Sequence, residues 1–292
     1  MLVPKSEKIA RVIITIFLIL LSMLCVLPMI YELAVSLSTN DYVTAGKVTF
    51  WPVGFTLHSY EYVLSYSSFW RSMLISFERL GLTWGMSMVV TVLTAYPLAH
   101  SKERLYGRNV IAWFFFIPMI FNGGLIPTYM VINTLGLIGT IWALVLPSLV
   151  VTFHVLLVMN FIRSLPGELE EAAMIDGANP IQILLRVILP VLTPCLATIT
   201  VYISLGTWNE WFNGIIYMNK PTQYPLMSYL RSTVLIQNAS DLSPEQQQRL
   251  ASIGNETFQA AQLFIATVPM LIIYPFLQKY FPQGLVLGSV KG

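Results

Sequence analysis

The sequence has little charge, since only 10% of its 292 residues are Asp, Glu, Lys or Arg and 56% are hydrophobic. A soluble domain carries about a quarter charged residues, so this composition excludes an ordinary soluble protein. The net charge of +2 is too small to indicate a nucleic-acid partner. The composition therefore predicts that most of the chain is surrounded by the lipid bilayer.

Sites for chemistry are also missing. His58, His100 and His154 are isolated from one another and from the two cysteines, whereas a metal site needs several converging ligands. No G-x-x-x-x-G-K-[ST] stretch occurs, so the chain lacks the glycine-rich turn that holds nucleotide phosphates. The sequence thus predicts no catalytic, cofactor-binding or metal site in this chain, and no enzymatic activity.

Long apolar runs are what the sequence does have. A membrane-spanning helix needs roughly 20 apolar residues, and six stretches reach that length. They cover residues 12–37, 72–98, 109–132, 138–160, 191–215 and 259–280. We therefore expect an all-α fold, in which residues 1–292 form a single transmembrane domain with six membrane helices.

Basic residues orient these helices, because short cytoplasmic segments carry excess Lys and Arg. With the N-terminus inside, the inner segments hold Lys5, Lys8, Arg11, Lys102, Arg104, Arg108, Arg163, Arg186, Lys279 and Lys291. The outer segments hold only Lys47, Lys220, Arg231 and Arg249. Both termini and segment 161–190 are therefore predicted to be cytoplasmic, and segment 216–258 extracytoplasmic.

The first apolar run is interpreted as a retained helix rather than a secretion signal. The hydrophobic region of a signal is only about 7 to 15 residues long. This run is longer and has no clear cleavage site. On the same span boundaries, Cys25 and Cys195 lie roughly 14 Å apart in depth, at about 1.5 Å per residue, which is too far for a disulfide.

The two outer segments differ in character. Residues 38–70 are rich in aromatic side chains, which can stack on sugars but also collect at membrane interfaces. Both interpretations stay open. In the second outer segment, "YPLMSYLRSTVLIQN" predicts a short amphipathic helix.

The stretch "LEEAAMIDGANPIQILLRVILP", residues 169–190, is polar and acidic although it lies between apolar spans. Small residues dominate one helical face, at i, i+3, i+4 and i+7, which carries Leu169, Ala172, Ala173 and Asp176. Gly177 then supplies a turn, and Asn179 with Pro180 begins a second helix that ends near Pro190. This element is either a docking surface for another protein or a loop folded on its own chain. Its acidic character disfavours a DNA-binding helix-turn-helix.

The stretch "EAAMIDGANPIQILLRVILP" resembles the EAA loop of binding-protein-dependent ABC importer permeases. The matching positions are Glu171, Ala172, Ala173, Gly177, Leu189 and Pro190, with Val187 in place of an isoleucine. Further along the chain, "GGLIPTYMVINTLGLIGTIWALVLP", "TWNEWF" and "GLVLGSVKG" resemble the oligosaccharide and polysaccharide branch of the carbohydrate importers. The resemblance covers nearly the whole chain from the second span onward.

The resemblance implies a multi-pass permease of the bacterial cytoplasmic membrane that imports an oligosaccharide or polysaccharide. It also implies four partner subunits: two ATPases that bind ATP and Mg, a second related permease and an extracytoplasmic solute-binding protein. In that family the EAA loop inserts into a groove on the ATPase and transmits its closure. The implied coupling residues are Glu171, Ala172, Ala173, Asp176, Gly177, Leu189 and Pro190.

Polar residues at membrane depth indicate a substrate path, because they usually face a bundle interior or a wet cavity. The candidates are Asn122, Tyr129, Trp208, Asn209 and Glu210. These residue types suit the hydroxyls and apolar faces of sugars, but hydrogen bonds between helices and an outer aromatic belt explain them as well. Asn209 is the preferred contact in this group. Gly123 and Gly124 also predict a broken third span.

Glu78 and Arg79 place two charges inside the second span, and adjacent helix positions do not face each other. Each charge therefore needs its own partner, at the membrane surface or across a permease dimer. Arg79 is also a candidate for attracting an acidic sugar such as a uronate, although a structural ion pair explains it equally well.

Other functions stay open at this stage. An ABC permease for a solute other than a sugar would carry the same coupling loop. A secondary transporter would show broken helices with ion-coordinating groups near mid-membrane, and would not need that loop.

Overall fold

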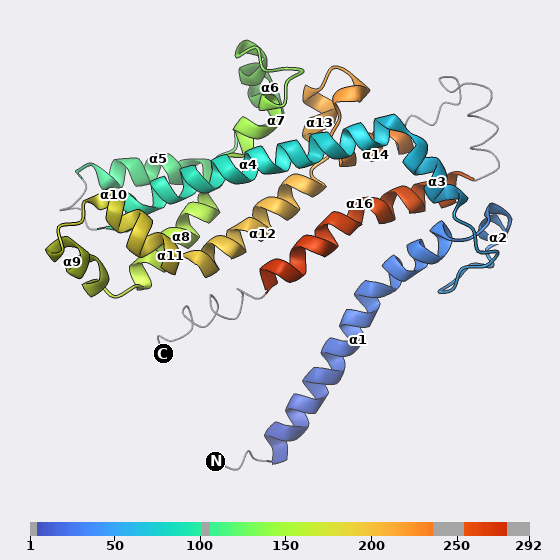
Figure 1. The fold of residues 1–292 in the computed structure, drawn as a ribbon, viewed down its shortest axis with the longest axis horizontal. Helices are drawn as coiled ribbons and strands as arrows, with labels where there is room; N and C mark the ends of the chain where they lie inside the picture. Colours follow the sequence, from blue (N-terminus) through green and yellow to red (C-terminus); the bar gives the residue numbers. More distant parts are fainter. Residues whose placement is uncertain (1–4, 101–105, 236–253, 279–292) are drawn as a thin grey trace. The chain divides into compact units, whose positions relative to one another are not determined.

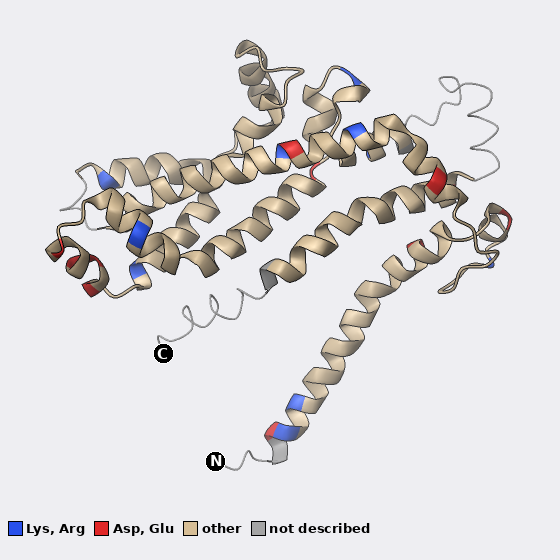
Figure 2. Ribbon diagram, in the orientation of Figure 1, with Lys and Arg blue, Asp and Glu red and all other residues tan. Residues whose placement is uncertain are grey.

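The computed structural model describes residues 5–100, 106–235 and 254–278. These residues form helices and connecting turns, with no strand among them, which confirms the all-α fold (Figure 1). Charged residues are sparse along the long helices, and acidic residues gather on the short helix α9, Glu168–Ile175 (Figure 2). The sequence "GLVLGSVKG" and residues 236–253 of the predicted outer segment lie outside the described residues.

The longest helices are α1 (Lys5–Ser36), α4 (Ser67–Ala99), α12 (Thr193–Asn209) and α16 (Asn255–Gln278). The shorter helices are α2 (Asn40–Thr44), α3 (His58–Ser65), α5 (Arg108–Ile120), α6 (Leu125–Thr134), α7 (Trp142–Val145), α8 (Thr152–Ser164), α9, α10 (Pro180–Gln182), α11 (Leu189–Val191), α13 (Phe212–Tyr217) and α14 (Leu226–Leu235). Two 3-10 turns cover Leu146–Ser148 and Pro221–Gln223, and a π-helical turn covers Ile183–Ile188. Helix α14 confirms the predicted short helix of the second outer segment.

Contacts divide the chain into two compact units. The first contains residues 1–70 and 232–268, and the second contains residues 71–231 and 269–292. Helices α4, α14 and α16 each contribute residues to both units. The single domain over residues 1–292 stays a prediction.

In the first unit, the end of α1 packs against the segment that follows it. Ala34 and Val35 are buried together with Val43 and Val48. The hydroxyl of Ser38 donates to the carbonyl of Ala34 at 2.6 Å and accepts the N–H of Val53 at 2.9 Å. Part of segment 38–70 is therefore a packed structure.

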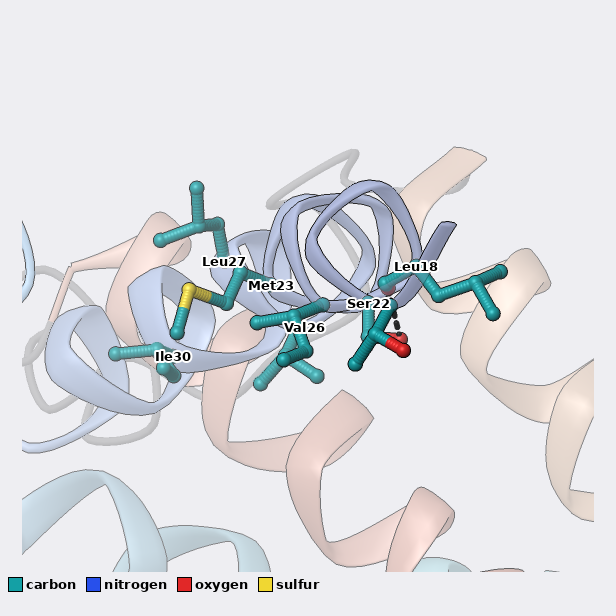
Figure 3. Close-up of a pocket in the computed structure, with 8 residues that line it drawn as sticks. Leu18, Ser22, Met23, Val26, Leu27 and Ile30 are labelled. Carbon is teal, nitrogen blue, oxygen red and sulfur yellow. Dashed lines mark hydrogen bonds between the residues drawn. The ribbon is translucent and has the colours of Figure 1, made fainter. Parts of the chain in front are cut away.

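The remainder of α1 exposes apolar side chains. Its most apolar window over Glu7–Ser36 has a mean hydropathy of 2.9 and none of that window is buried. A shallow groove runs along this helix between side chains that include Leu18, Met23, Val26 and Ile30 (Figure 3). The hydroxyl of Ser22 donates to the carbonyl of Leu18 at 2.8 Å, which removes its need for a partner outside the helix. Such a surface is suited to lipid or to another apolar helix.

Within the described residues, three helices are long and apolar enough to cross a membrane: α1, α4 and α16. Two bent pairs raise the number to five if each pair is one span. They are Trp142–Ser148 with Thr152–Ser164, bent by 43°, and Pro180–Val191 with Thr193–Asn209, bent by 77°. The predicted third span is divided between α5 and α6, and α5 has only 13 residues. Six spans therefore stay a prediction.

The second unit packs α4, α8 and α12 around a common core. This core contains Val92, Ala95, Leu98, Val155, Val158, Met159, Ile162, Ile183, Leu184, Ile188, Leu192, Cys195, Ile199 and Ile203. Cys195 is buried here, whereas Cys25 is exposed on α1, and both are free thiols, as predicted.

The predicted end of the fifth span at residue 215 was wrong. Helix α12 ends at Asn209, Glu210 is extended with φ −74° and ψ 116°, and a separate helix, α13, begins at Phe212. A carboxylate oxygen of Glu210 accepts the backbone N–H of Asn213 at 2.7 Å. This contact supports the start of α13 and is incompatible with a continuous helix through residue 210.

Candidate functional site

Three residues separate the end of α8 at Ser164 from the acidic helix α9. Leu165, Pro166 and Gly167 lead into α9, whose first turn contains Glu168, Glu170 and Glu171. Negative side chains are favourable there, because the unpaired N–H groups at a helix N-terminus carry partial positive charge. The acids therefore stabilise this short helix and also give the loop its charge.

Gly177 ends α9 in the way the sequence predicts. Its φ is +80°, a left-handed conformation that strongly favours glycine. The N–H of Gly177 bonds to the carbonyl of Met174, and the N–H of Ala178 bonds to the carbonyl of Ala173, both at 3.0 Å. These two bonds form a Schellman motif, which satisfies the last carbonyls of α9 and reverses the chain.

Asn179 begins the second helix, again as predicted. Its side chain accepts the N–H of Gln182 at 2.9 Å, and the side chain of Gln182 accepts the N–H of Asn179 at 2.9 Å. This capping box is followed by the π-helical turn and by α11. Because Pro190 has no N–H, it removes one helical hydrogen bond before the 77° bend into α12.

The two helices of the loop differ in exposure. Ile183, Leu184 and Ile188 of the second helix are buried in the core of the second unit. By contrast, Ile175 of α9 is 86% exposed. The second helix is therefore an anchor, and α9 is the part available to another molecule.

The candidate coupling residues take different positions within this loop. Glu171 and Ala172 are exposed on α9, Ala173 is half-buried against the core, and Asp176 caps the helix. Leu189 is half-buried and Pro190 exposed at the end of the second helix. Asp176 lies beyond the last helical residue, so the predicted face of α9 is shorter than the sequence spacing indicates.

His100 links α9 to α4, a contact that sequence analysis missed. Its Nε2 lies 2.7 Å from Oε2 of Glu170, and its Nδ1 lies 2.8 Å from the carbonyl of Tyr96. The side chains of His100 and Glu170 are 14% and 12% exposed. A movement of α9 would therefore displace His100 and the C-terminal end of α4 with it.

Two arginines stabilise the same end of α4. The guanidinium of Arg108 donates to the carbonyl of Leu98 at 3.0 Å. Arg163 donates to the carbonyls of Leu98 and Ala99 at 3.2 and 3.3 Å. Carbonyls at a helix C-terminus lack helical partners and carry partial negative charge, so cations are favourable there.

Arg79 and Glu210 form an ion pair within the second unit. Nη2 of Arg79 lies 2.9 Å from Oε2 of Glu210, and Nη1 donates to the carbonyl of Glu210 at 3.3 Å. The Arg79 side chain is 2% exposed, whereas the preceding Glu78 is exposed. The partner of Arg79 is thus in its own chain, and the ion pair joins α4 to the segment between α12 and α13.

The remaining path candidates have different surroundings. Trp208 is buried, with its ring centroid 5.1 Å from that of Phe77, and Asn209 is exposed at the end of α12. Tyr129 is 38% exposed and stacks on Tyr217 with ring centroids 6.2 Å apart. Burial raises the pKa of the Tyr217 hydroxyl, and the charge of Glu210 raises it further.

The break in the predicted third span is confirmed. Residues 121–124 are not helical, and Gly124 has a φ of +89°. The side chain of Asn122 accepts the N–H of Gly124 at 2.9 Å and so stabilises the turn. Asn122 therefore has a structural role in addition to any contact with substrate.

Asn209 is the preferred path candidate and its side chain is exposed, so its replacement tests the predicted contact. We expect Asn209→Ala to lower sugar uptake per assembled complex about threefold to tenfold, the effect of losing a hydrogen bond. Asn133→Ala, which removes an exposed amide from α6, is the matched control. Uptake and the amount of complex are measured together. Equal uptake by both variants would place the contact elsewhere.

A solved structure shares the fold of this chain. It is the crystal structure of a bacterial ABC transporter involved in the import of the acidic polysaccharide alginate. One of its chains matches with a TM-score of 0.86 and 30% identity, over 96% of this chain and 99% of that chain. The fold is therefore that of an ABC transporter permease.

Curated relatives show to which family of ABC transporter permeases the chain belongs. The polygalacturonan/rhamnogalacturonan transport system permease protein YtcP of Bacillus subtilis (strain 168) is 34% identical over 94% of this chain and 96% of its own length. Protein LplC of the same organism is 35% identical over 99% of this chain and 97% of its own. No protein-family model matches. The chain belongs to the family of carbohydrate ABC importer permeases, which favours the sugar importer over the other functions considered.

Proposed function

We propose that the chain forms one half of the translocation pathway for an acidic oligosaccharide. Two of the similar proteins support this substrate class. YtcP is a polygalacturonan/rhamnogalacturonan transport system permease, and the solved structure is that of a transporter involved in the import of the acidic polysaccharide alginate. The sugar is delivered by an extracytoplasmic solute-binding protein. A second, related permease chain supplies the other half of the pathway.

Helix α9 is the part of the chain that docks on the ATPase. The observation that carries this assignment is the contrast between the exposed, acidic α9 and the buried second helix of the loop. A helix that is accessible to a partner but anchored in the core can transmit the partner's movement to the rest of the chain. The coupling residues are Glu171, Ala172, Ala173, Asp176, Gly177, Leu189 and Pro190. The contact of Glu170 with His100 then carries the displacement into α4.

The proposal includes an orientation and a location. The chain spans the bacterial cytoplasmic membrane six times, with both termini and segment 161–190 in the cytoplasm and segment 216–258 outside. Lipid surrounds the apolar outer surface. ATP and Mg bind to two partner ATPase subunits, which supply the energy, so this chain carries no cofactor.

The separation of permease and ATPase gives a direct test. We expect the purified chain alone neither to bind nor to hydrolyse ATP, because its sequence has no phosphate-binding loop. Calorimetric titration with Mg-ATP measures binding, and phosphate release measures hydrolysis. The same assays on the complex with the ATPase subunits should give binding and turnover. Specific binding by the chain alone, or failure to copurify with an ATPase, would contradict the assignment.

A further inference from the structure

An arginine and a tryptophan form an exposed pair on the second unit. The guanidinium carbon of Arg231, on α14, lies 5.1 Å from the ring centroid of Trp211. Trp211 is 38% exposed and Arg231 is also exposed. No ion pair of the described residues involves Arg231. Its guanidinium is thus held in place by an aromatic ring while its N–H groups stay available.

The segments that carry this pair are fixed by short-range packing. The hydroxyl of Ser228 donates to the carbonyl of Trp211 at 2.7 Å, so α14 is tied to the start of α13. Gly214 of α13 lies so close to α14 that an added Cβ would come within 2.0 Å of the Ser228 hydroxyl. Trp211 and Arg231 are therefore preorganised, which reduces the entropy lost when a ligand binds.

Two further exposed cations belong to the second unit. Arg71 is exposed and donates to the carbonyl of Thr222 at 2.8 Å, and Lys220 is exposed two residues before that carbonyl. Of the acids in this unit, Glu210 is neutralised by Arg79. Glu78 is exposed seven residues after Arg71 on α4, about 10 Å along the helix. The second unit therefore carries exposed cations in addition to Arg231.

This combination suits one unit of an acidic sugar. A guanidinium can donate two parallel hydrogen bonds to a carboxylate, and it stacks well on an aromatic ring. The exposed indole offers an apolar surface to the C–H face of a sugar ring. We propose that Arg231 and Trp211 bind a uronate unit of the oligosaccharide as it enters from the extracytoplasmic side. This inference rests on the proposed function, which supplies the acidic substrate and the orientation.

The experiment uses the complete importer in phosphatidylcholine vesicles, with binding protein loaded with labelled trigalacturonate. We expect Arg231→Gln to lower the maximal uptake rate per complex about tenfold, which is about 1.4 kcal/mol. The concentration of loaded binding protein at half-maximal uptake should stay at the wild-type value. Arg231→Lys should recover part of the loss, because it keeps the charge without the planar fork. Trp211→Leu should also lower the maximal rate.

Lys47→Gln is the matched control, because Lys47 is also exposed and lies over an aromatic ring, 5.8 Å from the centroid of Tyr42. It should keep wild-type uptake. Uptake by Arg231→Gln within twofold of wild type would overturn the inference. A raised half-maximal concentration of binding protein would also overturn it, because that result indicates an effect on docking of the binding protein. The assay is repeated in vesicles with anionic lipid, and a loss of uptake confined to those vesicles would overturn the inference as well. If the wild-type importer takes up neutral oligosaccharides but no oligouronide, the proposed substrate class fails instead.

Discussion

Replacing Gly177 by valine is expected to lower sugar uptake at least about tenfold and to reduce copurification of the ATPase. The φ of +80° at Gly177 costs a residue with a side chain about 1–2 kcal/mol, and a β-branched residue more. No atom lies within 4 Å of an added Cβ, so the backbone conformation and not a clash causes the effect. We expect the turn to relax by changing the direction of α9, which would move the proposed docking surface.

A matched control separates the effect of backbone strain at Gly177 from that of similar strain elsewhere in the chain. Gly136 has a φ of +69° and equally open surroundings, but it lies between α6 and α7. Gly136→Val therefore carries a similar backbone penalty without disturbing α9, and should keep the ATPase in the complex. Similar losses for both variants would show that general instability is responsible.

Reversal of one charge on α9 tests the same surface without changing the backbone. Glu171 is exposed, and no ion pair of the described residues involves it. We expect Glu171→Lys to leave the fold intact and to weaken the attachment of the ATPase. Uptake and copurification are compared with wild type. Wild-type values for both Glu171→Lys and Gly177→Val would contradict the assignment of α9 as the docking helix.

The loop was predictable because its signals are local. A glycine that accepts a left-handed conformation, an asparagine cap and a proline at the first helical position each act within a few residues. The structure confirms the Gly177 turn and the Asn179 cap. The broken third span was predictable for the same reason, since Gly123 and Gly124 weaken the helix where they stand.

The contacts that join the elements were not predictable in this way. His100 and Glu170 are 70 residues apart, and Arg79 and Glu210 are 131 residues apart. Helical periodicity places each residue on a face of its own helix but does not say which distant residue lies opposite. The sequence therefore describes His100 as an isolated histidine, and it leaves the partner of Arg79 open between the membrane surface, a permease dimer, a structural ion pair and an acidic sugar.

The end of α12 shows how tertiary contacts override a local pattern. Apolar residues resume at Trp211 and Phe212 after the polar Asn209 and Glu210, and no glycine or proline lies between Thr207 and Asn213, so hydropathy alone extends the span. The helix nevertheless ends at Asn209. The carboxylate of Glu210 pairs with Arg79 and accepts the N–H of Asn213, and the backbone of Glu210 is extended where it makes these contacts.

Removing one member of the Arg79–Glu210 pair is expected to be strongly destabilising. Arg79→Met leaves the carboxylate of Glu210, whose side chain is only 25% exposed, without its cation. Breaking a buried pair in this way costs about 3–5 kcal/mol, whereas replacing both partners by neutral groups is often tolerated. The thermal unfolding midpoint of the complex should therefore fall for Arg79→Met and recover substantially for Arg79→Met with Glu210→Gln.

The exposed pair on α1 provides the control for this experiment. Arg11 lies 2.7 Å from Glu7, with side chains 68% and 48% exposed, and such pairs contribute about 0.2–1 kcal/mol. Arg11→Met should hardly change the unfolding midpoint. If Arg11→Met and Arg79→Met lower the unfolding midpoint equally, burial is not the reason why loss of the Arg79–Glu210 pair destabilises the protein.

The same double variant decides between the two roles considered for Arg79. If the arginine is structural, Arg79→Met with Glu210→Gln should keep oligouronide uptake per folded complex near the wild-type value. If its charge attracts the substrate, uptake should stay low even though stability returns. We expect the first result, because the guanidinium is 2% exposed and already faces a carboxylate of its own chain. Attraction of an acidic sugar requires a cation that is not neutralised in this way, and on the second unit Arg231 meets that condition.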